Sequence, residues 1–116
     1  FENNKKGSRK NINISIDQVI NQAFLLHSQG NIKEAEKYYQ YIIEQDYKDH
    51  RVFANYGLIL VNTNRFKEAE FYTRKAISLN PNLAMAHCNL GSILINFGKL
   101  EEAEFYHRKA ISLNPN

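Results

Sequence analysis

The sequence predicts an all-α fold built from three repeated helical hairpins, and two observations lead to this prediction. The first is a duplication: EAEFYTRKAISLNPN at 68–82 returns 34 residues later as EAEFYHRKAISLNPN at 102–116, and a weaker copy, INQAFLLHSQGNIKEAEKYY, occupies 20–39. Such a fixed period is typical of repeat folds. The second is the helical spacing of apolar residues within each copy. We therefore divide the folded region, 16–116, into repeats 16–49, 50–83 and 84–116.

Each repeat carries two helical faces in succession, with core positions that recur at intervals of three and four residues. The expected core positions are Val19, Gln22, Ala23 and Leu26, then Ile32, Ala35, Tyr39, Ile42 and Ile43 in the first repeat; Phe53, Tyr56, Gly57 and Leu60, then Phe66, Ala69, Thr73, Ala76 and Ile77 in the second; and His87, Leu90, Gly91 and Leu94, then Leu100, Ala103, His107, Ala110 and Ile111 in the third.

The first helix has a recognisable start. Ser15 and Gln18 form a capping-box pattern, and Ile14 and Val19 have the spacing of a hydrophobic staple. We therefore expect the helix to begin at Ile16.

The helix ends are marked by residues with special backbone preferences. Gly30, Asn64 and Gly98 share one position between the two helices of a repeat, where only Gly and Asn readily adopt a left-handed conformation. Pro81 and Pro115 follow the second helices and prevent their continuation.

Two glycines stand inside the first helices, where glycine costs about 1 kcal/mol relative to alanine. Gly57 and Gly91 therefore predict a close approach between helices, with Ala69 and Ala103 as the matching small residues.

The basic charge belongs to the N-terminal segment. Residues 1–13 hold Lys5, Lys6, Arg9 and Lys10 against Glu2, and the remaining residues hold eleven basic and eleven acidic side chains. This balance argues against a folded domain that binds nucleic acid through phosphate contacts. We expect residues 1–15 to form a basic, disordered tail or linker.

The composition narrows the class of protein further. Cys88 is the single cysteine, so no intramolecular disulfide can form, which suits the cytoplasm. We see no signal peptide and no apolar run approaching a membrane span. Because the chain begins with Phe1 rather than Met and stops directly after a repeat, we expect a piece of a longer protein.

The repeat resembles the tetratricopeptide repeat family. The residues that carry the resemblance in the second and third repeats are Gly57/Gly91, Ala69/Ala103, Ala76/Ala110 and Pro81/Pro115. The first repeat departs from the pattern, with Gln22 for Leu, Ile42 for Ala and Tyr47 for Pro. The resemblance implies a right-handed superhelical solenoid whose first helices line a concave, peptide-binding groove.

One polar position recurs in all three first helices. Asn21, Asn55 and Asn89 stand at equivalent positions, although asparagine is a poor helix former. The row is similar to the asparagine ladder in the repeat domain of O-linked N-acetylglucosamine transferase and its relatives, which holds the backbone of protein substrates. The alternative is that duplication copied these residues and that they bond only neighbouring repeats or water.

The rest of the expected groove is chemically mixed. Its other residues are Phe24, His27, Arg51, Leu58, Asn62, Met85, Cys88, Ser92 and Asn96, and Ile20 lies beside them. Family members that capture C-terminal carboxylates use a clamp of Lys, Asn, Asn, Lys and Arg. Only Asn55 matches it, and its basic positions hold Ile20, Met85 and Asn89. We therefore predict no carboxylate clamp.

Candidates for chemistry are few. His87, Cys88 and His107 supply metal-binding side chains, but adjacent helical residues point about 100° apart and no fourth ligand is evident. The Glu104-x-x-His107 spacing also occurs in di-iron bundles, which need further glutamates. The Tyr38-Tyr39, Phe71-Tyr72 and Phe105-Tyr106 pairs recur at core spacing and are expected to pack between repeats. We predict no metal, no cofactor and no catalytic residue.

The sequence therefore predicts a non-enzymatic module that binds a protein or an extended peptide, and neither nucleic acid nor a membrane. Two alternatives stay open. In the first, the chain is the substrate-recruiting N-terminal arm of a larger modifying enzyme such as a glycosyltransferase. In the second, it is a self-assembling scaffold that forms homo-oligomers through its uncapped third repeat.

Overall fold

The computed structural model describes residues 15–115, which form six helices and no strand. The helices are α1 (Ile16–Ser28), α2 (Ile32–Glu44), α3 (His50–Asn62), α4 (Phe66–Leu79), α5 (Ala84–Asn96) and α6 (Leu100–Leu113). The all-α prediction is confirmed. The basic segment and the contribution of Ile14 to a staple lie outside the described residues.

The chain divides into two compact units, 1–42 and 43–116, which are described separately. In the first unit, α1 begins at Ile16 as expected. The backbone N–H of Gln18 donates to Ser15 Oγ at 3.2 Å, and the backbone N–H of Ser15 donates to Gln18 Oε1 at 3.0 Å. This reciprocal pair satisfies donors that the first turn of a helix otherwise leaves unpaired, so the capping box is confirmed.

The turns between helices have the backbone that the sequence predicts. Gly30, Asn64 and Gly98 have φ angles of 82°, 62° and 76°. Asp46, at φ 60°, is a fourth left-handed residue that the sequence pattern did not reveal. It follows α2, in the repeat that lacks the terminal proline, and its N–H donates to Ile43 O at 2.9 Å. A left-handed residue thus follows the helix end that the other repeats mark with proline.

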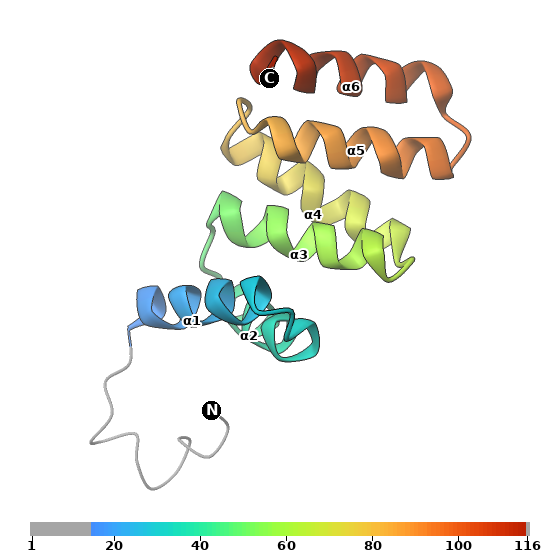
Figure 1. Cartoon of the computed structure of the whole chain (residues 1–116). Coiled ribbons are helices and arrows are strands. Elements are labelled where there is room, and N and C mark those ends of the chain that lie inside the picture. The colour runs from blue at the N-terminus through green and yellow to red at the C-terminus, as the bar shows by residue number, and fades with distance from the viewer. Residues whose placement is uncertain (1–14, 116) are drawn as a thin grey trace, which may run out of the picture. The chain divides into compact units, whose positions relative to one another are not determined.

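The second unit contains α3 to α6, and Figure 1 shows α4 crossing behind α3 and α5. One core cluster is formed by Phe53, Ala54, Ala76 and Ala86, with Tyr72, Ile77 and Leu83 packed against it. The other is formed by Leu90, Leu94 and Ala103, with Ile77 and Tyr106 packed against it. Ile77 belongs to both clusters, so α4 takes part in both halves of the core.

The two helical glycines mark close approaches, but the partners differ from those expected. A Cβ on Gly57 would lie 2.5 Å from Thr73 Oγ1, and a Cβ on Gly91 would lie 2.6 Å from the His107 ring. The matching residues are therefore Thr73 and His107 rather than Ala69 and Ala103. Ala69 contributes only its carbonyl oxygen, at 3.7 Å from the Gly57 position.

Several expected core residues lie on the surface. Phe71 and Phe105 are 56% and 63% exposed, whereas their neighbours Tyr72 and Tyr106 pack against the core. Adjacent helical residues point about 100° apart, so only one residue of each aromatic pair reaches the core. Gln22, Leu100 and Ile111 are also exposed although they stand at core positions of the pattern.

Candidate functional site

The expected groove residues of the second unit share one face of α3 and of α5. We call this surface the α3–α5 face. Its residues are Arg51, Asn55, Leu58 and Asn62 on α3, and Met85, Cys88, Asn89, Ser92 and Asn96 on α5. None of them is fully buried, although Ile59 and Ile93, one turn after Asn55 and Asn89, are core residues. The two helices are in contact with each other.

Asn55 and Asn89 occupy equivalent positions on α3 and α5, and both are half-buried. The Nδ2 atom of Asn89 is shielded from solvent and has no hydrogen-bond partner among the described residues. A buried polar group without a partner costs about 1–3 kcal/mol. The Asn89 amide therefore does not use this donor to join neighbouring repeats.

Arg51 is held by the residue that caps its own helix. Asp49 accepts hydrogen bonds from the backbone N–H of Arg51 at 2.8 Å and from its Nη2 at 2.7 Å. Burial alone would raise the pKa of Asp49, but the hydrogen bonds and the charge of Arg51 outweigh it and lower that pKa. The guanidinium of Arg51 therefore contacts the N-cap residue of α3, and the carboxylate of Asp49 largely neutralises its charge.

The α1 residues of the expected groove behave differently from one another. Asn21 is exposed, whereas Ile20 is only 2% exposed and is a core residue rather than a groove residue. Phe24 and His27 pack against Tyr39 of α2, with ring centroids 6.2 and 5.8 Å away. They therefore hold the first hairpin together as well as lining its surface.

A partly buried hydrogen bond between α1 and α2 also stabilises this hairpin. His27 Nδ1 and Tyr39 Oη lie 2.9 Å apart, a contact that the sequence pattern did not indicate because it joins residues on different helices. Burial lowers the pKa of His27, which favours the neutral imidazole. The neutral ring can pair with the tyrosine hydroxyl as donor or as acceptor.

The candidates for metal binding or catalysis have other roles. His87 is buried, its Nε2 lies 2.7 Å from Pro81 O, and its ring stacks on Tyr106 with centroids 5.8 Å apart. Cys88 is an exposed free thiol on the α3–α5 face. Among residues 15–115, no group of three or more His, Cys, Asp and Glu side chains is arranged to hold a metal ion.

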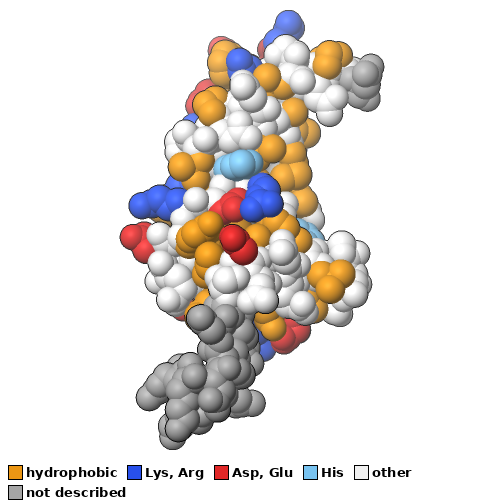
Figure 2. Space-filling view, turned by 90° about the vertical axis from the view of Figure 1, so that its left-hand side faces the viewer, with side chains coloured by type: hydrophobic (Ala, Val, Ile, Leu, Met, Phe, Trp, Pro, Cys, Tyr) orange, Lys and Arg blue, Asp and Glu red, His pale blue; other side chains and the backbone are white. Residues whose placement is uncertain are grey.

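Charges on the described surface are mixed in sign. Figure 2 shows basic and acidic side chains interspersed with separate hydrophobic patches on one face of the molecule. Among the described residues, ion pairs that form within one helix include Lys37–Glu34 at 3.3 Å, Arg74–Glu70 at 3.0 Å and Arg108–Glu104 at 2.7 Å. None of the helices in the described part of the chain combines the length and apolarity needed to cross a bilayer.

Comparison with known protein families finds two matches. Models described as "Tetratricopeptide repeat" match residues 50–83 and 84–116, which together make up more than half of the chain. Comparison with curated protein sequences finds no match.

Comparison with solved structures finds similar helical proteins. The type III secretion translocator chaperone SycD of Yersinia enterocolitica is 22% identical with a TM-score of 0.74, over 87% of this chain and 76% of that one. MamA is 19% identical with a TM-score of 0.78, over 87% of this chain and 59% of that one. PcrH, in complex with the chaperone binding region of PopD, is 19% identical with a TM-score of 0.75, over 84% of this chain and 74% of that one. At these identities the likeness establishes the fold.

Proposed function

Because the chain belongs to the tetratricopeptide repeat family, we propose that it is a non-enzymatic interaction module that binds an extended segment of a partner protein along its first helices. The structurally similar PcrH is in complex with a region of another protein, PopD, which supports this mode of action. The proposal places the chain in the cytoplasm, where the exposed thiol of Cys88 stays reduced.

The asparagine row is the observation that carries the proposal. First helices that pack at ordinary distances lie roughly 10 Å apart, and an extended peptide advances about 3.3 Å per residue. Asn55 and Asn89, which belong to the same unit, would then meet the ligand backbone about three residues apart. Each carboxamide offers both donors and an acceptor.

The neighbouring side chains suggest which peptides fit. Leu58, Met85 and Cys88 offer apolar contacts on the same face as Asn55 and Asn89. Arg51 is already paired with Asp49, so the α3–α5 face lacks a free cation at that position. We propose that the module takes internal, largely uncharged segments rather than acidic C-terminal tails.

Replacement of the asparagines tests the proposal. An unbiased array of immobilised 12-residue peptides is screened with the whole chain, and the best peptide is titrated by fluorescence anisotropy. Replacing Asn21, Asn55 and Asn89 with Ala should weaken binding at least tenfold, because each hydrogen bond contributes about 0.5–1.5 kcal/mol.

Asn82→Ala is the matched control, because Asn82 is exposed in the turn between α4 and α5 and belongs to neither helix of the α3–α5 face. It should leave the affinity unchanged. Equal affinity of the triple variant and the original chain would disprove the asparagine row as a ligand site.

A further inference from the structure

A buried histidine joins the third hairpin to the turn that precedes it. His87 occupies on α5 the position that Phe53 has on α3. Phe53 stacks on Tyr72 with ring centroids 5.9 Å apart and an interplanar angle of 17°. His87 stacks on Tyr106 in nearly the same way, at 5.8 Å and 20°. The histidine therefore packs like the phenylalanine, but it brings two ring nitrogens to a position that is only 4% exposed.

One of these nitrogens has a partner and the other has none. His87 Nε2 lies 2.7 Å from the carbonyl oxygen of Pro81. Because a carbonyl oxygen can only accept, Nε2 carries the hydrogen and donates it. In the neutral ring Nδ1 is then an unprotonated acceptor, and it is shielded from solvent without a partner among the described residues. The contact with Pro81 thus selects one tautomer and leaves Nδ1 as the place for a second proton.

A proton added at Nδ1 would create a buried N–H group that has no acceptor, which is destabilising. It would also place a positive charge on the fourth residue of α5, close to the positive end of the helix dipole. The first turn of α5 contains no acidic residue to compensate this charge. On α6, Lys109 occupies the position that Lys75 has on α4, where the Lys75 Nζ lies 5.7 Å from the Phe53 ring.

The charged groups on the other side of the stacked tyrosine do not offset this cost. The hydroxyl of Tyr106 accepts from Arg74 Nη1 at 3.4 Å, and the Arg74 guanidinium lies 5.9 Å from the centre of the Tyr106 ring. A cation therefore already interacts with the ring on which His87 stacks. The carboxylates of this cluster, Glu70 and Glu102, lie 3.0 and 3.7 Å from Arg74 and pair with it.

We define the His87 junction as Pro81, His87 and Tyr106. We propose that this junction is an acid-sensitive joint, which is closed while the His87 ring is neutral and loosens when Nδ1 gains a proton. A locally opened chain accepts that proton in water, so the closed junction binds fewer protons and its stability falls as the pH falls. The inference concerns the junction alone and does not depend on the peptide binding proposed above.

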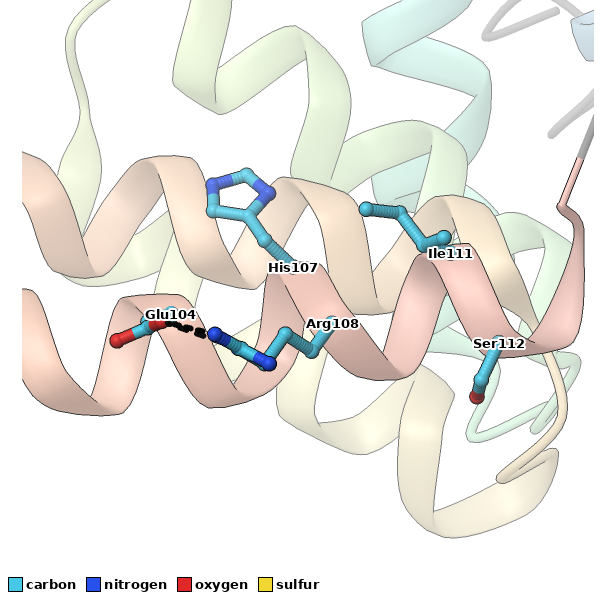
Figure 3. A pocket seen from close by; sticks show the side chains of 5 residues that line it. All are labelled: Glu104, His107, Arg108, Ile111 and Ser112. Carbon is cyan, nitrogen blue, oxygen red and sulfur yellow. Dashed lines mark hydrogen bonds and ion pairs between the residues drawn. The ribbon is translucent and has the colours of Figure 1, made fainter.

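The other histidine of the third hairpin has different surroundings. His107 is only partly buried, and it lines a shallow hollow on α6 together with the ion pair of Glu104 and Arg108 (Figure 3). A proton on His107 would have a carboxylate nearby. We therefore assign the sensitivity to His87 and not to His107.

NMR spectra that correlate the ring hydrogens and nitrogens of histidine determine the tautomer in the original chain. At pH 7, His87 should carry its hydrogen on Nε2, and its Nδ1 should be unprotonated. A ring with the hydrogen on Nδ1, or a ring that is already charged at pH 7, would overturn the proposal.

Backbone hydrogen exchange measures the loosening itself. Protection factors, which divide out the intrinsic pH dependence of exchange, are compared at pH 7 and pH 5, on either side of the usual titration of histidine. We expect the protection of α5 to fall roughly fivefold to a hundredfold at pH 5, the range expected for a buried N–H group without an acceptor. The amides of α3, which carries Phe53 at the equivalent position, should change less and serve as the internal reference.

His87→Phe is the matched variant, because the chain already contains the corresponding stack of Phe53 on Tyr72. The variant should be folded by circular dichroism, and the protection of its α5 should no longer fall with pH. His27→Asn, in the other compact unit, should retain the fall.

Equal protection of α5 at both pH values in the original chain would overturn the proposal, and so would a fall that persists in the folded His87→Phe variant. The tautomer and the exchange of the original chain are measured without any variant, so the proposal can be refuted even if His87→Phe does not fold.

Discussion

At the scale of single residues, a buried hydroxyl group and a glycine opposite it determine how closely two helices approach. The hydroxyl of Thr73 is buried and has no hydrogen-bond partner among the described residues, and it lies where a Cβ on Gly57 would have to be. Because Gly57 has no Cβ, α4 can approach α3 closely at this position. The energetic cost of glycine in a helix is offset by the packing that this approach allows.

Gly57→Ala should therefore destabilise the protein although alanine is the better helix former. The clash of a Cβ 2.5 Å from Thr73 Oγ1 costs roughly 1–3 kcal/mol, and the helix-propensity gain returns at most about 1 kcal/mol. Urea unfolding, followed by circular dichroism, measures the net loss.

Thr73→Ala provides the matched test, since it removes the group that the new Cβ would meet. In the Thr73→Ala background, Gly57→Ala should be neutral or stabilising. Destabilisation of the same size in both backgrounds would show that Thr73 is not what requires the glycine.

At the scale of elements, the helix ends follow from local backbone chemistry. α4 and α6 end at Leu79 and Leu113, and the next residues, Asn80 and Asn114, have φ angles of −142° and −144°. Both asparagines precede a proline, which disfavours the helical conformation of the residue before it. The sequence could predict these ends because the cause lies within two neighbouring residues.

The left-handed turns make a quantitative prediction at this scale. Gly98 has φ 76° and has open space around the position of a Cβ, so Gly98→Ala should cost about 1 kcal/mol through backbone strain alone. For a domain of about 100 residues this corresponds to a fall in Tm of roughly 4–8 °C.

Gly98→Asn should cost less than Gly98→Ala, because asparagine tolerates the left-handed conformation and already occupies the equivalent turn at Asn64, at φ 62°. Thermal unfolding compares the two variants. A larger loss for Asn than for Ala would argue that something other than φ determines the residue at this position.

At the scale of the whole molecule, groups with shifted pKa values link stability to pH. Burial lowers the pKa of His27 below 6.5, so the unfolded chain binds more protons than the folded chain near neutral pH. The stabilisation is complete above the unfolded pKa and is lost as the pH falls through the lower, folded pKa. Stability should therefore decrease between pH 7 and pH 5.

His27→Asn should reduce the slope of the unfolding free energy against pH in this range. The reduction should correspond to less than one bound proton, as determined from urea unfolding at a series of pH values. Asn82→Ala, which removes no titratable group, is the control and should retain the slope of the original chain. Asp49, whose pKa is lowered by Arg51, adds a second loss of stability as the pH falls below 3.8. An unchanged slope in the His27 variant would contradict the assignment to His27.

The positions of the asparagines along their helices were predictable, but the surroundings of these side chains were not. Helical periodicity predicts that Asn55 and Asn89 lie beside the core positions, and both are half-buried. Periodicity did not reveal that Asn89 Nδ2 is shielded and unpaired, or that Arg51 is bound to Asp49. These properties depend on side-chain conformations and on neighbouring helices.

The sequence by itself determined the helices, their 34-residue period and their ends, because these follow from interactions between residues a few positions apart. Only the tertiary structure decided which equivalent residues differ in their surroundings. Ile77 lies within two core clusters and Ile111 is exposed, although the helices around them are nearly identical in sequence. The physical reason is that burial depends on the element packed alongside, which the sequence of one helix does not contain.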